Sequence, residues 1–495
     1  MENHMSEQEA LAGLKEALEA LGNSMLKAEK EHEGIIQALP SAQRAACINL
    51  LHYLALRSED LRDLQYHLHV KGLSSLSSAE SHIHAQLTAI LERLGKIPEH
   101  ADSPCTYEQA LKDMDQKAAA LFGAKAEMLI PHIMATFDTA YADDYNAVKE
   151  LLLSGMTVAR INCAHDDESI WEKMIRNIQK ASAETGIPCK IYMDIAGPKI
   201  RTRLKGKKKK KQKLELQEGE RLLLVDSKKF PEEEGPARVI GCSMEGIIGQ
   251  LKPGARVLFD DGIFECKVEN IEDNIAVLTV TRISSPKPFL KEDKGINFPD
   301  SRLDISSLTD FDRACLPFIG RHADLVGYSF VRTAHDIVDL QAALTGDKVE
   351  KQPFIILKIE TAEAVKHLPA LLLESMKQPV FGVMIARGDL AIELGFERMS
   401  EIQEELVWIC EAAHVPVIWA TQVLETLNKS GLATRSEITD ASYSALAECV
   451  MINKGKHIVE VITTLRDIFH RSGGHHVKKR YIFRPLNIAK EYIRS

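Results

Sequence analysis

The stretch "CKIYMDIAGPKIRT", residues 189–202, decides the fold. It begins as an apolar run, ends that run at the acid Asp194, and continues through a Gly-Pro turn to the cations Lys199 and Arg201. Near-continuous apolar runs are typical of strands in parallel sheets that helices cover on both faces. Whether the polar end of this run is a solvated loop or part of a shared site depends on the rest of the chain.

Seven further apolar runs repeat this pattern, and amphipathic helical segments lie between them. The runs occupy residues 129–137, 157–162, 324–330, 354–360, 380–386, 416–421 and 448–453. Eight strand–helix units of this kind predict the α/β class and a parallel (β/α)8, or TIM, barrel.

Two segments do not fit the barrel pattern. Residues 1–125 carry apolar residues at helical spacing and predict an all-helical N-terminal extension. Residues 203–292 contain alternating runs punctuated by turn residues, which predicts a small β-barrel domain inserted into the TIM barrel. The barrel itself is expected in residues 126–202 and 293–472, with a C-terminal tail in residues 473–495.

Composition narrows the class of protein. The chain has 495 residues, 45% of them hydrophobic, and a net charge of -9, which argues against a general nucleic-acid or membrane binder. No apolar run is long enough to span a bilayer, and residues 1–22 lack the apolar segment of a signal peptide. The nine cysteines are dispersed without a CxxC pair, which predicts reduced thiols and a cytoplasmic location. The lysine-rich run at 206–213 is interpreted as a solvated turn.

Polar residues follow most of the expected strands. Active sites of (β/α)8 barrels lie at the carboxyl ends of the strands, so these residues are expected to share one rim. Any one of them fits a solvated loop, but so many at one rim predict a site. They are Arg160, Asn162, His165, Asp194, Lys199, Arg201, Ser329, Arg332, Lys358, Glu360, Arg387, Gly388, Asp389, Thr421 and Gln422.

The spacing of these residues suggests phosphoryl chemistry. Glu360 and Asp389 end neighbouring strands, and two carboxylates can hold one Mg²⁺. Lys358 lies two residues before Glu360 and points to the same side, while Arg160 adds a second positive charge for a phosphoryl group. Residues 387–393 are expected to begin a helix whose first N–H groups bind an anion, and Thr421 offers a hydroxyl for proton relay.

Several blocks in order resemble the pyruvate kinase family over roughly residues 130–470. They include "TVARINCAH" (157–165), "MDIAGPKIRT" (193–202), "IILKIETAEAV" (355–365), "VMIARGDLAIE" (383–393) and "PVIWATQVLETL" (416–427). The resemblance implies a (β/α)8 barrel with an inserted β domain that closes over the site. It also implies transfer of phosphoryl from phosphoenolpyruvate to ADP, giving pyruvate and ATP, with Mg²⁺ or Mn²⁺ as cofactor and a homo-oligomeric assembly.

The resemblance also implies a role for each matching residue. Lys358 would neutralise the phosphoryl group and the enolate, and Arg160 would contact the transferring phosphoryl group. Glu360 and Asp389 would hold the divalent metal. Thr421 would lie on the route that protonates the enolate. The remaining matches are Gly388 with Asp389 for the substrate carboxylate, and Asn162, His165, Arg201 and Lys294 for the nucleotide.

Departures from the family pattern leave alternatives open. Ala164 replaces a serine of the family's usual K⁺ site, and Lys199 replaces a glutamate. Lys199 is therefore expected to lie beside Asn162 and Asp194 and to stand in for K⁺. The protein would then not require K⁺. The alternative is that Lys199 only pairs with a nearby acid such as Asp194. Residues 453–456 replace the family's "SGETA" block, which motivates a second reading, a non-catalytic sensing or scaffolding relative. A third reading keeps the enolate chemistry with another acceptor, or as a lyase.

Overall fold

The protein is described here by a computed structural model that covers residues 7–96, 103–125, 127, 130–205, 213–228, 230, 238–346, 352–472, 476–478 and 480–481. Most of the lysine-rich run at 206–213 and most of the expected tail at 473–495 lie outside the described residues. Within the described part of the chain, no helix is both long and apolar enough to cross a membrane.

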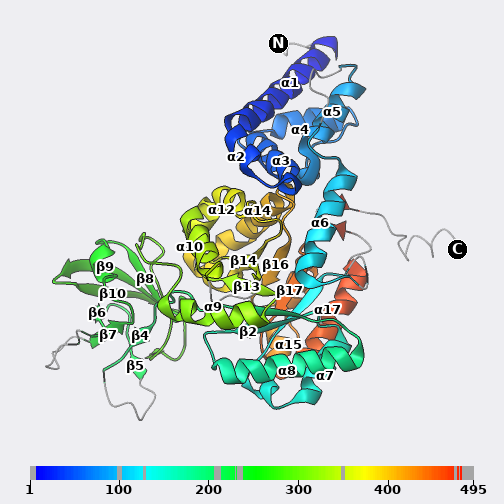
Figure 1. Cartoon of the computed structure of the whole chain (residues 1–495). Helices are drawn as coiled ribbons and strands as arrows, with labels where there is room; N and C mark the ends of the chain where they lie inside the picture. Colours follow the sequence, from blue (N-terminus) through cyan, green and yellow to red (C-terminus); the bar gives the residue numbers. More distant parts are fainter. Residues whose placement is uncertain are drawn as a thin grey trace, which may run out of the picture.

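A closed barrel of eight parallel strands forms the centre of the molecule, which confirms the predicted fold (Figure 1). Its order is β1-β17-β16-β15-β14-β13-β3-β2. The strands are β1 (His132–Thr136), β2 (Val158–Asn162), β3 (Lys190–Asp194), β13 (Leu325–Tyr328), β14 (Phe354–Ile359), β15 (Gly382–Ala386), β16 (Val417–Ala420) and β17 (Cys449–Ile452). Each coincides with one of the eight apolar runs.

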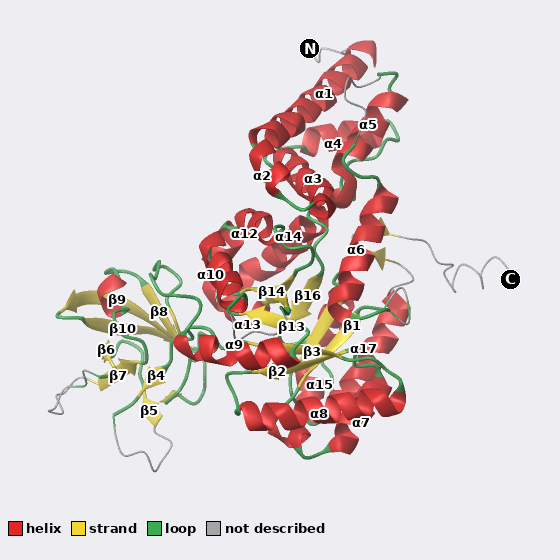
Figure 2. Cartoon of the chain, viewed as in Figure 1, coloured by secondary structure: helices red, strands yellow, loops and turns green. Residues whose placement is uncertain are grey.

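Helices surround these strands and bury their outer faces (Figure 2). They are α7 (Tyr145–Ser154), α8 (Glu168–Thr185), α9 (Asp310–His322), α10 (Ala334–Leu344), α11 (Ala362–Lys366), α12 (Leu368–Ser375), α13 (Arg387–Leu394), α14 (Met399–Ala412), α15 (Glu425–Ser430), α16 (Arg435–Tyr443) and α17 (Ile458–Ser472). Polar caps fix several helix starts: Asp167 accepts from the N–H groups of Ser169 and Ile170 at α8, and Thr434 begins a capping box at α16.

The N-terminal segment folds as helices, as predicted. They are α1 (Glu7–Glu31), α2 (Glu33–Ala38), α3 (Ser41–Arg57), α4 (Arg62–Val70), α5 (Ile83–Arg93) and α6 (Tyr107–Phe122). Leu121 and Phe122, at the end of α6, pack with Ile356 and Met384 in the barrel interior. An added Cβ on Gly382, the first residue of β15, would lie 3.1 Å from Leu121. Helix α6 therefore closes the barrel end opposite the carboxyl rim.

The inserted domain lies beside the barrel, away from the helical extension (Figure 1). Its main sheet has the order β12-β8-β9-β10-β6-β7-β4, and β5 pairs with β11. The strands are β4 (Thr202–Arg203), β5 (Lys213–Glu215), β6 (Arg221–Asp226), β7 (Arg238–Cys242), β8 (Arg256–Phe259), β9 (Phe264–Glu272), β10 (Ile275–Ile283), β11 (Phe289–Lys291) and β12 (Ile296–Asn297).

Two chain segments, residues 199–202 and 294–296, join the insert to the barrel and also close the sheet. We call these two segments the insert hinge. The Thr202 N–H donates to the Lys294 carbonyl at 2.7 Å, and the Ile296 N–H donates to the Ile200 carbonyl at 2.9 Å. These bonds link the first and last strands, so the insert is rolled up as a small barrel with its own apolar core. The sheet begins at Thr202 and ends at Asn297, just outside the expected range of 203–292.

Candidate active site

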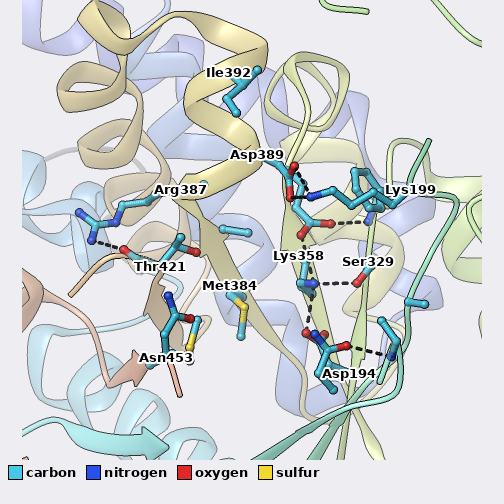
Figure 3. A pocket seen from close by; sticks show the side chains of 18 of the residues that line it. Asp194, Lys199, Ser329, Lys358, Met384, Arg387, Asp389, Ile392, Thr421 and Asn453 are labelled. Atoms are coloured by element: carbon cyan, nitrogen blue, oxygen red, sulfur yellow. Dashed lines mark hydrogen bonds and ion pairs between the residues drawn. The ribbon is translucent and has the colours of Figure 1, made fainter. Parts of the chain in front are cut away.

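A cavity of about 440 Å³ opens at the carboxyl ends of the barrel strands (Figure 3). It brings together the following residues singled out from the sequence: Arg160, Asn162, His165, Asp194, Lys199, Arg201, Ser329, Lys358, Glu360, Arg387, Gly388, Asp389, Thr421 and Gln422. Asp261 of the insert also lines it. Arg332 does not line this cavity, because its guanidinium donates to the carbonyls of Leu303 and Ile305 instead.

Asp194 is the centre of a buried hydrogen-bond network. Its Oδ2 accepts from Arg160 Nη2 at 2.5 Å and from Lys358 Nζ at 3.2 Å, and its Oδ1 accepts from the Tyr192 hydroxyl at 3.0 Å. A carboxylate that is 2% exposed needs such partners to stay charged. Burial would raise the pKa of Asp194, but the charges of Lys358 and Arg160 outweigh burial and hold this pKa below its ordinary value.

Lys358 is held in place on three sides. Its ammonium lies 2.6 Å from the Ser329 hydroxyl, 3.1 Å from Glu360 Oε1 and 3.2 Å from Asp194 Oδ2. Burial lowers the pKa of Lys358, but the charges of Asp194 and Glu360 outweigh it, so the pKa lies above its ordinary value. The lysine is therefore a fixed positive charge in the lining of the cavity.

Two carboxylates, those of Glu360 and Asp389, line the cavity near Lys358. Glu360 follows β14, and its Oε2 accepts the Phe330 N–H at 2.7 Å. Asp389 lies in the first turn of α13. Burial raises the pKa of Glu360 above its ordinary value. The positive charge of Lys358 lowers this pKa, but the negative charges of Asp389 and Asp194 raise it further. Two carboxylates that repel each other in this way suit a divalent cation such as Mg²⁺ or Mn²⁺.

No cluster of three or more potential metal ligands occurs among the residues that the structure describes. Glu360 and Asp389 could supply two carboxylate ligands to a divalent cation, and water and substrate oxygens would complete its shell. Mg²⁺ is commonly bound in this manner, through one or two carboxylates.

Lys199 contacts Asp389 and not Asp194. Its ammonium lies 2.8 Å and 3.1 Å from the two carboxylate oxygens of Asp389. Gly197, with φ +68°, turns the chain after β3 and carries Lys199 across the rim toward α13. Asn162 Oδ1 accepts the Ala164 N–H at 3.0 Å. The expected grouping of Lys199 with Asn162 and Asp194 is thus replaced by an ion pair to Asp389.

The loop after β16 has an uncommon backbone conformation. Thr421, Gln422 and Leu424 have φ values of +75°, +58° and +49°, which cost energy in residues other than glycine. Arg387 holds the loop, because its Nε donates to the Ala420 carbonyl at 3.0 Å and its Nη2 to the Thr421 carbonyl at 2.6 Å. Strand–helix spacing alone gave no signal for this anchoring role.

The contact between Gly388 and Thr421 is close. A Cβ added to Gly388 would lie 2.9 Å from the Thr421 methyl group, so only glycine lets the start of α13 approach this side chain. The first turn of α13 and the Thr421 side chain therefore face the same part of the cavity.

One wall of the cavity is cationic. It is formed by the loop after β2, the loop after β17 and the insert hinge. Burial lowers the pKa of His165, and the charges of Lys454, Arg201 and Arg160 lower it further, which favours the neutral imidazole. Arg201 Nη1 donates to the Asp293 carbonyl at 3.0 Å. Lys294 is not among the residues that line the cavity, and its ammonium pairs with Asp260 at 2.7 Å.

Tyr192 was not singled out from the sequence. A Cβ on Gly327 of β13 would lie 1.9 Å from the Tyr192 hydroxyl oxygen and 2.3 Å from Asp194 Oδ1. The glycine therefore makes room for the phenol beneath the site. The signal that could have found this pair is a large aromatic residue in an otherwise aliphatic strand with a glycine on the neighbouring one.

The fold and the cavity define a (β/α)8-barrel protein whose carboxyl rim carries both acidic and cationic side chains, with an inserted β domain beside the barrel that contributes Asp261 to the cavity. The family model described as pyruvate kinase, barrel domain, matches residues 131–457, and the chain belongs to the pyruvate kinase family.

Similar proteins carry the same family name. The chain is 30% identical over 339 residues to a pyruvate kinase of Geobacillus stearothermophilus, covering 67% of this chain and 55% of that protein. It is 31% identical over 323 residues to pyruvate kinase 1 of Trypanosoma brucei brucei (64% and 62%). It is 31% identical over 347 residues to pyruvate kinase 2 of Synechocystis sp. (68% and 56%). The chain thus spans little more than half the length of these relatives.

Proposed function

We propose that this chain is a Mg²⁺-dependent phosphotransferase of pyruvate kinase type, which moves the phosphoryl group of phosphoenolpyruvate to ADP and releases pyruvate and ATP. The observation that carries the proposal is Lys358, a buried ammonium fixed between Asp194, Ser329 and Glu360 at the floor of the cavity. A positive charge held there favours a transition state in which negative charge develops, without reorganisation during the reaction.

The residues of this chain divide the work of the reaction. Lys358 and Arg160 offset the charge of the phosphoryl group and of the enolate oxygen. The backbone N–H groups of Gly388 and Asp389, at the start of α13, orient the substrate carboxylate. Thr421 passes a proton toward the enolate carbon as pyruvate forms.

The metal and the nucleotide complete the proposal. A divalent cation held by Glu360 and Asp389 supplies Lewis-acid polarisation of phosphoryl and carboxylate oxygens when bound. The nucleotide phosphates lie along the cationic wall, where the proposed contacts are Asn162, His165, Arg201 and Lys294. Lys199 brings a permanent positive charge into the same cavity, so K⁺ is not required.

Location and assembly are also proposals. The nine cysteines are free thiols, which suits a reducing cytoplasm. Leu432, Ile438 and Tyr443, near α15 and α16, are exposed apolar side chains that suit burial between copies of the chain in a homo-oligomer.

A lactate-dehydrogenase-coupled assay tests the activity, with phosphoenolpyruvate, ADP and Mg²⁺ in buffer free of Na⁺ and K⁺ and then with K⁺ added. Turnover without K⁺ supports the whole proposal. Turnover only with K⁺ keeps the phosphotransfer and removes the role of Lys199 as the built-in cation. The absence of turnover in both buffers would contradict the proposal.

Lys358→Met is the sharpest variant for the site. It should abolish phosphoryl transfer, because Lys358 is the lysine that pairs with both Asp194 and Glu360 among the described residues. Lys117→Met is the matched control, since Lys117 is equally buried and paired with Asp113 in the helical extension, far from the rim. Both variants lose a buried ion pair, so activity lost in both would show instability and not chemistry.

A non-catalytic sensing or scaffolding protein is the second candidate. The loop after β17, residues 453–456, favours it because this loop replaces the family's "SGETA" block. Asn428 Nδ2 donates to the Asn453 carbonyl at 2.7 Å, and the side chain of Asn428 packs against Gly455, so this loop has an ordered structure of its own. Binding of phosphoenolpyruvate measured by calorimetry, with neither ADP binding nor turnover, would favour this candidate. Turnover with another nucleoside diphosphate would instead indicate a different acceptor.

A further inference from the structure

The ion pair between Lys199 and Asp389 joins the insert hinge to the barrel (Figure 3). The ammonium reaches both oxygens of the carboxylate, at 2.8 Å and 3.1 Å. The side chains are only partly exposed, 30% for Lys199 and 19% for Asp389. Water therefore screens this pair less than an ordinary surface ion pair.

Lys199 belongs to the insert hinge by its backbone. The next residue, Ile200, accepts the Ile296 N–H, and the two hinge segments lie against each other from there onward. The Gly295 backbone lies alongside the lysine stem, because an added Cβ there would be 3.5 Å from Lys199 Cε. Asp389, in contrast, is fixed to the barrel through α13. The ion pair therefore joins the insert hinge to α13, next to a second contact in which Asn297 Nδ2 of β12 donates to Glu393 Oε1 of α13 at 3.0 Å.

The other carboxylate proposed to hold the metal has its own partners. Glu360 Oε1 lies 3.1 Å from Lys358 Nζ, and Oε2 accepts the Phe330 N–H. A divalent cation held by both carboxylates needs an oxygen of Asp389, and both of these oxygens face the Lys199 ammonium. A metal ion about 2 Å from that carboxylate would lie within a few ångströms of the ammonium, and like charges at that distance repel strongly.

We propose that Lys199 is an internal counter-ion that competes with the divalent metal for Asp389, so that metal binding releases this lysine and removes the ion pair between the insert hinge and α13. The inference rests on the proposed function only for the assignment of Asp389 as a metal ligand. Metal binding and the ion pair between the insert hinge and α13 are then coupled, because the Lys199 ammonium cannot pair with Asp389 while a metal ion occupies that carboxylate.

Direct binding of Mn²⁺ tests this competition without any turnover. The amount of free Mn²⁺ is followed by electron paramagnetic resonance for the full-length wild type, Lys199→Met and Lys199→Arg. Removing the competing ammonium should tighten Mn²⁺ binding about three- to tenfold, the range expected for a partly buried ion pair. Lys199→Arg, which keeps a cation suited to a carboxylate, should bind no more tightly than the wild type.

Lys294→Met is the matched control. Lys294 also lies on the hinge and pairs with one aspartate, Asp260, so its loss removes the same charge without touching Asp389. Its Mn²⁺ affinity should stay within about twofold of wild type, because a screened charge acts weakly at a distance. Equal tightening in Lys199→Met and Lys294→Met would overturn the proposal in favour of a general field effect.

Amine labelling of the wild type gives a second readout. Mass spectrometry after brief acylation should show more modification of Lys199 with Mg²⁺ than without, and no such change at Lys190, which pairs with Asp324 away from the rim. Protection of Lys199 by Mg²⁺ would overturn the proposal.

The outcomes separate this proposal from the proposed function. A Mn²⁺ affinity of Lys199→Met equal to that of the wild type would refute the competition between Lys199 and the metal. It would leave the proposed phosphotransferase activity unaffected. Absence of Mn²⁺ binding in every variant would remove the competition together with the metal site on which the phosphotransferase depends. Mn²⁺ binding that follows the expected order in a chain without turnover would support the competition and not the phosphotransferase.

Discussion

Replacing Tyr192 by phenylalanine should weaken the site from beneath. The phenol is fully buried, and its hydroxyl donates to Asp194 Oδ1 at 3.0 Å. Phenylalanine keeps the ring that packs beneath the cavity and removes only this donor. Asp194 retains Arg160 and Lys358 on its other oxygen, so the carboxylate stays ionised and the barrel stays folded.

The size of the effect follows from the charge of the acceptor. A hydrogen bond to a charged group contributes about 1.5–3 kcal/mol, and no cavity is created to add to the loss. We expect the free energy of unfolding to fall by about this amount. If the same energy is lost from the alignment of Asp194 with Lys358, kcat should fall about ten- to a hundredfold, at about 1.4 kcal/mol for each factor of ten.

Urea unfolding and the coupled assay measure the two effects separately. Tyr53→Phe is the control, because Tyr53 is also buried and its hydroxyl accepts from Arg57 Nη1 at 2.6 Å in the helical extension. The control should lose stability and keep its turnover. A Tyr192→Phe variant that unfolds and turns over like wild type would refute the argument, and a loss of stability alone would restrict Tyr192 to a structural role.

Three further variants probe the loop after β16 at the rim, the barrel end that α6 closes, and the contact between Glu393 of α13 and Asn297 of the insert. Arg387→Lys loses the forked donor that holds the β16 loop, so kcat should fall at least tenfold in the coupled assay with little change in the urea midpoint. Phe122→Ala should cost about 3–5 kcal/mol of unfolding free energy and leave KM unchanged, because the cavity it creates lies at the far end of the barrel. Burial raises the pKa of Glu393 to about 7; the hydrogen bond from Asn297 lowers this pKa, and the charge of Asp389 raises it. Because the pKa is higher in the folded state than in the unfolded state, the free energy of unfolding should fall as pH rises from 4.5 through 7. Glu393→Gln should remove that fall, and a pH profile of unfolding identical to wild type would contradict the assignment.

The barrel was predictable because its signal is local and repeated. Each buried strand needs a nearly continuous apolar run, and the run at 189–195 has seven counterparts at the spacing that helices require. The rim residues followed from the same reasoning, since the carboxyl ends of parallel strands meet at one end of a barrel. Lys358 and Glu360 therefore share a cavity with Asp389, as the sequence predicted.

The partners of these residues were not predictable. Lys199 was expected near Asp194, five residues earlier in the chain, but the turn at Gly197 directs it to Asp389 on another strand–helix unit. The sequence also carried no signal that α6 is buried in the barrel end opposite the carboxyl rim. An amphipathic pattern indicates that a helix packs through its apolar face, but it does not indicate which surface that face packs against.

The sequence by itself determined the class of fold, the helical extension, the inserted β domain and the set of charged residues at the rim. It did so because periodicity and strand ends are properties of neighbouring residues. Only the tertiary structure decided that Asp194 binds Arg160, Lys358 and Tyr192, and that Lys199 pairs with Asp389. Those contacts join residues far apart in the chain, and their geometry depends on barrel closure, which no local pattern specifies.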